Sequence, residues 1–301
     1  MVLRICLWIF FIGTFSGCSL LEPKGANTVP NKDRFSEVQQ HARLADAAYQ
    51  DATKIEQISA EYGYQLIKHG VVPSDDVQYF FLTHPITKAQ IISVRGTANL
   101  ENVLVDMKVA MLTDERIGIR LHRGFSSAAQ AIYNELKPYL NKQAPLYTVG
   151  HSLGGAVAVI LAINLDVDEY KIGGVTTFGQ PKVTDRSGAD KFKHIPITRV
   201  VNEKDMVPLV PHINATLSKL PSIYWHLGEE LVMLPGNFYS TLSGKESMAR
   251  GLTVLKASVT ARDLDAHKMA VYQARINEKM TAAENVPYSE RMQYIDAAMT
   301  R

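Results

Sequence analysis

The sequence predicts an α/β fold in which a central, mostly parallel sheet is flanked by helices. Short apolar runs alternate with helix-like segments through the middle of the chain, and a Gly-x-Ser-x-Gly pattern around Ser152 joins one such run to one such segment. Alternating strands and helices form parallel sheets that are covered on both faces. In sheets of this kind the functional site lies at the carboxyl ends of the strands.

The spacing of apolar residues predicts the individual elements. Helical spacing predicts helices over 35–51, 124–137, 153–161 and 263–280. Apolar runs predict strands over 77–83, 89–94, 146–149, 174–178, 197–202 and 224–233. The first two of these strands are expected to form a hairpin or to lie side by side. Because only short Gly and Pro breaks interrupt the pattern, residues 35–301 are expected to form a single domain.

Composition excludes some classes of function. The chain has 301 residues, of which 46% are hydrophobic and 21% charged, as in globular proteins with a sizeable core. Its net charge is only +2 and no long run carries one sign. Nucleic acid needs a clustered basic face, so we expect no nucleic-acid partner.

The first residues resemble an export signal. Arg4 precedes an apolar run over 5–15, and Phe15-Ser16-Gly17-Cys18-Ser19 resembles the bacterial lipoprotein box, in which the cysteine is acylated. Residues 1–17 are therefore predicted to be a signal peptide and 18–34 a flexible tether. An acylated Cys18 would hold the protein on a membrane of the bacterial cell envelope. An uncleaved anchor over 5–21 and plain secretion with a free Cys18 remain alternatives.

Ser152 is the candidate nucleophile. An apolar strand over 146–149 precedes it and an apolar helix over 153–161 follows it. On such a sharp strand-to-helix turn the hydroxyl is pushed out of the sheet, and glycines flank the serine because a Cβ would clash across the turn. A glycine-rich turn without chemistry is the alternative interpretation.

A serine needs a base that takes its proton and a carboxylate that orients the base. Asp205 is the candidate acid, because it follows the strand over 197–202 in a loop stiffened by Pro208 and Pro211. A solvated loop aspartate is the alternative. In this architecture the chain order is serine, acid, histidine.

Four histidines follow the serine: His194, His212, His226 and His267. His194 precedes the acid, and His212 is too near it in sequence to reach across. His267, which begins the predicted helix over 263–280, is preferred as the base, and His226 remains the alternative. The oxyanion of an intermediate would bind the backbone N–H of Leu153 and the hydroxyl of Thr97, which follows the strand over 91–95. A merely polar turn at 95–97 is the alternative there.

Several segments together resemble the fungal-type (class 3) lipase family. They are Arg95-Gly96-Thr97 with Asn102 and Asp106, His122-Arg-Gly-Phe125, Gly150 to Gly155, Thr177 to Val183, Asn202 to Pro211, and Asp265-Ala-His267 with Tyr272. The resemblance implies an α/β-hydrolase fold and a lid over about 98–107. It implies that Ser152, Asp205 and His267 act as nucleophile, acid and base, and that Thr97 and Leu153 are oxyanion donors.

By this resemblance the expected function is a serine carboxylic ester hydrolase, a lipase that cleaves acylglycerol esters through an acyl-enzyme and needs no metal or cofactor. The alternatives are a phospholipase A1, a short-chain esterase on the same site, and a non-catalytic envelope lipoprotein that serves as a scaffold.

Overall fold

The computed structural model describes residues 31–72, 76–97, 111–211, 213–214, 222–254 and 265–299. The predicted signal peptide, Cys18, most of the predicted tether and the predicted lid lie outside these residues. The last four positions of the predicted tether, 31–34, belong to the first helix.

The helices are α1 (Asn31–Ala47), α2 (Ala52–Glu61), α4 (Arg123–Leu136), α5 (Leu153–Val167), α6 (Arg186–Lys191), α7 (Gly244–Val254), α9 (Met269–Asn277) and α10 (Arg291–Met299), with short 3₁₀ turns at Lys137–Tyr139, Val207–Leu209 and Tyr288–Glu290. The strands are β1 (Gln65–Val72), β2 (Val77–Thr83), β3 (Gln90–Val94), β4 (Met111–Asp114), β5 (Ile119–His122), β6 (Leu146–His151), β7 (Ile172–Phe178), β8 (Thr184–Asp185), β9 (Ile197–Asn202), β10 (Ile213–Asn214), β11 (Ser222–Trp225), β12 (Glu229–Met233), β13 (Phe238–Leu242) and β14 (Glu284–Asn285).

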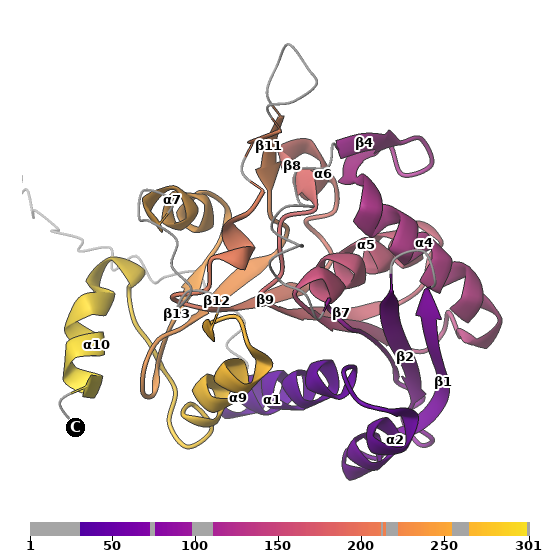
Figure 1. Ribbon diagram of the computed structural model, residues 1–301, viewed down its shortest axis with the longest axis horizontal. Coiled ribbons are helices and arrows are strands. Elements are labelled where there is room, and N and C mark those ends of the chain that lie inside the picture. The colour runs from indigo at the N-terminus through magenta and orange to yellow at the C-terminus, as the bar shows by residue number, and fades with distance from the viewer. Residues whose placement is uncertain are drawn as a thin grey trace, which may run out of the picture.

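A nine-stranded sheet forms the centre of the molecule (Figure 1), in the order β1-β2-β3-β6-β7-β9-β12-β13-β14. Neighbours from β3 to β12 are parallel. β1, β2 and β13 extend this block with antiparallel pairings. The predicted mostly parallel sheet is confirmed, and so is the predicted pairing of 77–83 with 89–94.

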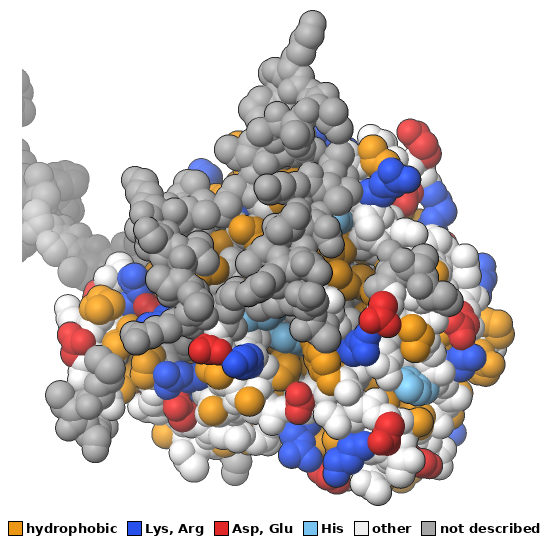
Figure 2. Space-filling view, in the orientation of Figure 1, with side chains coloured by type: hydrophobic (Ala, Val, Ile, Leu, Met, Phe, Trp, Pro, Cys, Tyr) orange, Lys and Arg blue, Asp and Glu red, His pale blue; other side chains and the backbone are white. Residues whose placement is uncertain are grey.

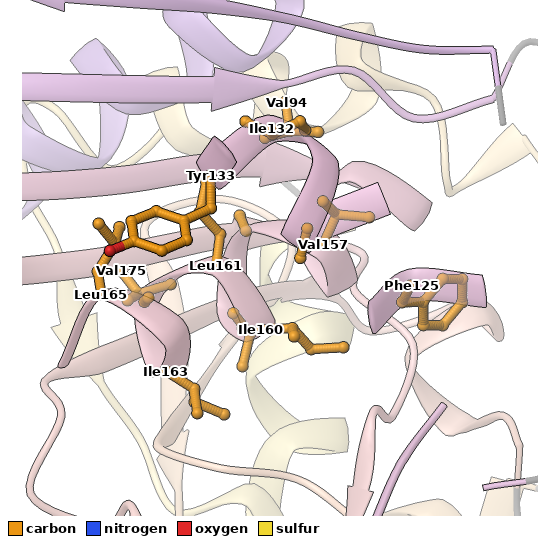
Figure 3. Close-up of a cluster of buried hydrophobic side chains, with 14 of the residues drawn as sticks. Val94, Phe125, Ile132, Tyr133, Val157, Ile160, Leu161, Ile163, Leu165 and Val175 are labelled. Atoms are coloured by element: carbon orange, nitrogen blue, oxygen red, sulfur yellow. The ribbon is translucent and has the colours of Figure 1, made fainter. Parts of the chain in front are cut away.

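Helices cover both faces of the sheet, as predicted. α4 and α5 pack on one face, and α1, α2 and α9 pack on the other (Figure 1). α5 is apolar nearly all round and twelve of its residues are buried. Figure 3 shows Val157, Leu161 and Ile163 of α5 pointing in different directions into the same cluster. This helix is therefore an interior element, which fixes the position of its first turn.

The prediction of one strand over 224–233 is wrong. β11 ends at Trp225 and pairs with β8 in a second sheet, whose order is β10-β11-β8-β5-β4. β12 begins at Glu229 and pairs with β9 in the central sheet. The chain changes sheets between these two strands, and an apolar run does not reveal where its hydrogen-bond partners change.

The helix predicted over 263–280 is shorter than expected. Residues 263–264 lie outside the described residues, Asp265 is helical, Ala266–Lys268 form a turn, and α9 runs only over Met269–Asn277. His267 therefore lies in the turn before the helix, and α10 follows later in the chain. The backbone N–H of Lys268 donates to Asp265 O (3.1 Å), which closes this turn before the helix begins.

The described surface carries mixed charge. Figure 2 shows acidic and basic side chains interspersed along the visible described surface, without a continuous patch of one sign. Within the part of the chain that the structure describes, no helix combines the length and apolar character needed to cross a membrane.

α1 is attached to the sheet partly through a buried imidazole. His41 is 4% exposed, and its Nδ1 lies 2.8 Å from Thr176 Oγ1 on β7. Burial lowers the pKa of His41 to about 4. The unfolded chain therefore binds a proton near pH 6.5 that the folded chain does not bind until about pH 4.

We predict that His41 makes the fold less stable as the pH falls from 6.5 towards 4. Near pH 5, the contribution of His41 to the change in the free energy of unfolding with pH approaches about 1.4 kcal/mol per pH unit. His41→Asn keeps a polar group near Thr176 and removes this titration. Denaturant unfolding of both proteins at several pH values would measure it. Parallel stability curves for the two proteins would contradict the prediction.

Candidate active site

The turn between β6 and α5 holds Ser152 in a left-handed backbone conformation, with φ +57° and ψ −131°. Its backbone N–H donates to Phe178 O at the end of β7 (2.8 Å). A Cβ at Gly150 would lie 2.4 Å from Gly154 O across the turn, and a Cβ at Gly154 would lie 2.2 Å from Val94 O at the end of β3, so both flanking glycines are required by close backbone contacts. A non-glycine residue in this conformation is strained, and such strain is found at functional sites.

Asp205 and His267 form a buried pair. Asp205 follows β9 and is fully buried, and its Oδ2 lies 2.8 Å from Nδ1 of His267, which is 3% exposed. The hydroxyl of Tyr272 on α9 donates to the same oxygen (2.5 Å), and the backbone N–H of Val207 donates to Oδ1 (2.9 Å). Both carboxylate oxygens are therefore held, and the imidazole has a fixed orientation.

The turn that carries His267 is tied to the sheet from two sides. The side chain of Asn202, the last residue of β9, donates to Ala266 O (2.7 Å). Nε2 of His151, the last residue of β6, lies 2.7 Å from His267 O. Because that acceptor is a carbonyl, Nε2 of His151 carries the proton and Nδ1 accepts a hydrogen bond from Tyr49.

Ser152 directly follows His151, whose ring packs against that of His267. The rings of His151 and His267 are 4.6 Å apart between centroids. Ser152 Oγ and His267 Nε2 are both buried and neither makes a hydrogen bond. The structure thus brings Asp205 and His267 into direct contact and leaves Ser152 Oγ and His267 Nε2 buried without a partner. Catalytic hydrogen bonds are often long before substrate binds.

The other predicted histidines lie elsewhere. His226 is half-buried, its Nε2 donates to Pro208 O (2.7 Å), and desolvation of its ring lowers its pKa well below the usual value. His194 is mostly exposed and pairs with Asp166 (2.9 Å). His212 lies outside the described residues. The contact with Asp205 therefore favours His267 over His226 as the base.

The predicted oxyanion donors lie on either side of Ser152. Leu153 is the first residue of α5, so its backbone N–H is one of the unpaired donors of a helix N-terminus. Thr97 follows β3 and is half-buried. The preceding residue, Gly96, lies against Ser152, because a Cβ there would lie 2.8 Å from Ser152 Cβ. The roles of these two donors stay predictions.

Sequence reasoning missed Tyr49 and His151. The Tyr49 hydroxyl lies 2.7 Å from His151 Nδ1 and also accepts a hydrogen bond from the backbone of Gly96. Burial and the neighbouring His267 lower the pKa of His151 to about 3, so its ring is neutral. His151 is the first variable position of Gly-x-Ser-x-Gly, so the motif offers a weak sequence signal that it lies near the site. Tyr49 lies about a hundred residues away, and no sequence pattern indicates that it lies there.

The described residues contain no group of three His, Cys, Asp or Glu side chains placed to hold a metal ion. The site is thus built from a strained serine, a fixed imidazole and a buried carboxylate. This arrangement can activate an alcohol for attack on an electrophilic carbonyl.

Comparison with known proteins points to one family. The model of the family described as "Lipase (class 3)" matches residues 91–215. A lipase of Rhizomucor miehei is 34% identical over 133 residues, which cover 40% of this chain and 37% of that protein. Lipase A of Sodiomyces alcalophilus is 24% identical over 279 residues, covering 69% of this chain and 67% of that protein. The match thus spans little more than a third of the Rhizomucor lipase.

The fold is also similar to solved structures. The crystal structure of a lipase from Rhizopus microsporus var. chinensis aligns with a TM-score of 0.58 at 24% identity, covering 67% of this chain and 75% of that one. At this identity the likeness shows the fold, which is a lipase-like α/β-hydrolase fold as expected.

We predict that Gly179→Ala separates the acid from the base. Gly179 follows β7 with φ +61°, and a Cβ there would lie 2.6 Å from His267 Cε1 and 2.8 Å from Asp205 Oδ2. The low-field proton resonance of the hydrogen bond between these two side chains should shift or disappear, and the Tm should fall. The control is Gly124→Ala, whose Cβ would meet only His122 at 3.8 Å. An unchanged resonance in Gly179→Ala would show that Asp205 and His267 keep their hydrogen bond despite the added Cβ, and would contradict the prediction.

Proposed function

Because this chain belongs to the class 3 lipase family, we propose that it is a serine carboxylic ester hydrolase that cleaves acylglycerols through an acyl-enzyme. The observation that carries the proposal is the strained Ser152, with an unpaired buried hydroxyl, beside the hydrogen-bonded pair of Asp205 and His267.

In the proposed first step, Ser152 Oγ attacks the carbonyl carbon of the ester and its proton passes to His267 Nε2. The carbonyl oxygen becomes an oxyanion, which accepts hydrogen bonds from the Leu153 N–H and the Thr97 hydroxyl. Asp205 keeps the proton of His267 on Nδ1 and stabilises the positive ring. Collapse of the intermediate breaks the bond to the alcohol, which leaves with the proton from Nε2.

In the second step, water attacks the acyl-enzyme and His267 takes its proton. The second tetrahedral intermediate collapses, the acid is released, and the proton returns to Ser152 Oγ. No other group is needed to balance either step. The burial of Asp205 and His267 supports this assignment, because a preorganised dry site strengthens the electrostatic interactions that the transition state uses.

We also propose that Cys18 is acylated and holds the protein on a membrane of the bacterial cell envelope. The support is the sequence alone, in which a positive charge and an apolar run precede Ser16-Gly17-Cys18. A membrane-held enzyme would meet lipid esters at a surface. This proposal is independent of the proposed chemistry.

The proposed nucleophile predicts that Ser152→Ala lowers the turnover of p-nitrophenyl esters by about 10⁴-fold or more and leaves the Tm nearly unchanged. The same variant should no longer react with a fluorophosphonate probe. Ser187→Ala is the control, because Ser187 is exposed and its hydroxyl bonds only Asp185 Oδ1 (2.8 Å).

Full activity in Ser152→Ala would refute the assignment, and an unreactive folded wild type would favour the scaffold interpretation.

Emulsified triacylglycerols and phosphatidylcholine vesicles should then be compared as substrates. Preferential release of fatty acid from triacylglycerols is expected, whereas preference for the phospholipid would indicate a phospholipase A1.

The proposed anchor predicts that the protein, expressed in a bacterial host, incorporates labelled palmitate and sediments with membranes. Each buried methylene of an acyl chain contributes about 0.8 kcal/mol to membrane binding. Cys18→Ala should lose both properties, and Cys6→Ala should keep them. Membrane attachment that survives Cys18→Ala would indicate an uncleaved anchor over 5–21 instead.

A further inference from the structure

The loop that carries Asp205 contains three successive carbonyls held from outside the loop. After β9 the chain turns through Val207–Leu209, and Pro208, Leu209 and Val210 follow the acid closely in sequence. Nε2 of His226 donates to Pro208 O (2.7 Å). Lys182 holds the next two, with its Nζ on Leu209 O (2.7 Å) and its backbone N–H on Val210 O (3.0 Å).

The side chain of Lys182 is costly to bury. Lys182 is 3% exposed, and burial, together with the nearby guanidinium of Arg199, lowers its pKa to about 7. The groups packed around it are Arg199 on β9, Glu230 on β12, Arg250 on α7 and His226. A single carboxylate thus faces two guanidinium groups and an amine. An apolar residue of similar volume would avoid this desolvation cost, so stability alone is a poor reason for the lysine.

The same group of residues is itself tightly fixed. Arg250 donates to Glu230 Oε1 through Nε (3.0 Å) and Nη2 (2.5 Å). Arg199 donates to Leu227 O (2.9 Å) and to Ser247 Oγ (3.0 Å). The cavity among these side chains has a volume of about 10 Å³, room for roughly one water molecule. Arg199 and Glu230 are thus fixed by hydrogen bonds, and Lys182 and His226 line the same small cavity.

We propose that Lys182 is a positioning residue, which acts with His226 to hold the loop after β9 so that Asp205 stays in hydrogen-bonding contact with His267. This inference rests on the proposed function, because the position of Asp205 affects turnover only if His267 is the base. Neither Lys182 nor His226 touches the substrate in this scheme. Both act through the backbone of the loop.

Lys279 provides a matched control. It is 1% exposed, its pKa is lowered to about 8 chiefly by burial, and its Nζ donates to Leu234 O and Gly236 O (both 2.6 Å). It is thus a second buried lysine that holds two carbonyls of a turn. That turn follows β12 and does not carry Asp205.

The test compares Lys182→Met with Lys279→Met in the full chain. Both variants should lower the Tm. Only Lys182→Met should lower kcat for a p-nitrophenyl ester, by about 10²-fold with KM little changed, because a displacement of about 1 Å in a catalytic group costs this much. Only Lys182→Met should shift or remove the low-field proton resonance of the hydrogen bond between His267 and Asp205. Equal losses of kcat in both variants, or a normal resonance in Lys182→Met, would overturn the proposal.

A second pair of variants keeps the test decisive if Lys182→Met does not fold. His226→Leu removes the donor to Pro208 O, and His226→Gln restores a donor at a similar distance from the backbone. The leucine variant should lose kcat and the resonance, and the glutamine variant should regain both; identical behaviour of the two would overturn the proposal. The resonance is measured without substrate, so a wild type with no esterase activity would refute the proposed function and leave this test readable.

Discussion

The left-handed backbone at Ser152 is the constraint on which the rest of the site depends. A residue with a side chain resists this conformation. It is held from three directions: β6 leads into it, Phe178 O accepts its N–H, and α5 follows it. Because α5 is buried nearly all round, its first turn cannot swing away without opening the core. The packing of an apolar helix thus maintains the strained position of one polar residue.

Parallel strands bring the remaining groups to the same edge of the sheet. β6, β7 and β9 are consecutive neighbours, and they end next to Ser152, Gly179 and Asp205 respectively. His267 belongs to no strand and comes from the C-terminal part of the chain. Its turn is fastened to β6 by His151 and to β9 by Asn202. His267 is therefore positioned by the same two strands that position Ser152 and Asp205.

Hydrogen bonding separates the groups that are fixed from those free to react. Each oxygen of Asp205 accepts at least one hydrogen bond, and Nδ1 of His267 is paired with it. Ser152 Oγ and His267 Nε2 are buried without a partner. Unpaired buried polar atoms are costly in a resting protein. Here they are the two atoms that would exchange a proton, so the unmet hydrogen-bonding capacity lies where a substrate can use it.

The sequence alone determined the parallel block of strands, the interior helix α5 and the residues 152, 205 and 267 as a candidate set. A long apolar helix, a glycine-flanked serine and an aspartate after a buried strand each leave a pattern in nearby residues, and their order along the chain joined the three residues into one set. The change of sheet between β11 and β12, and the turn rather than helix at His267, left no such pattern. Tyr49, Lys182 and His226 gained their positions only from tertiary structure. A contact between residues tens of positions apart depends on how elements pack, and no short stretch of sequence records that packing.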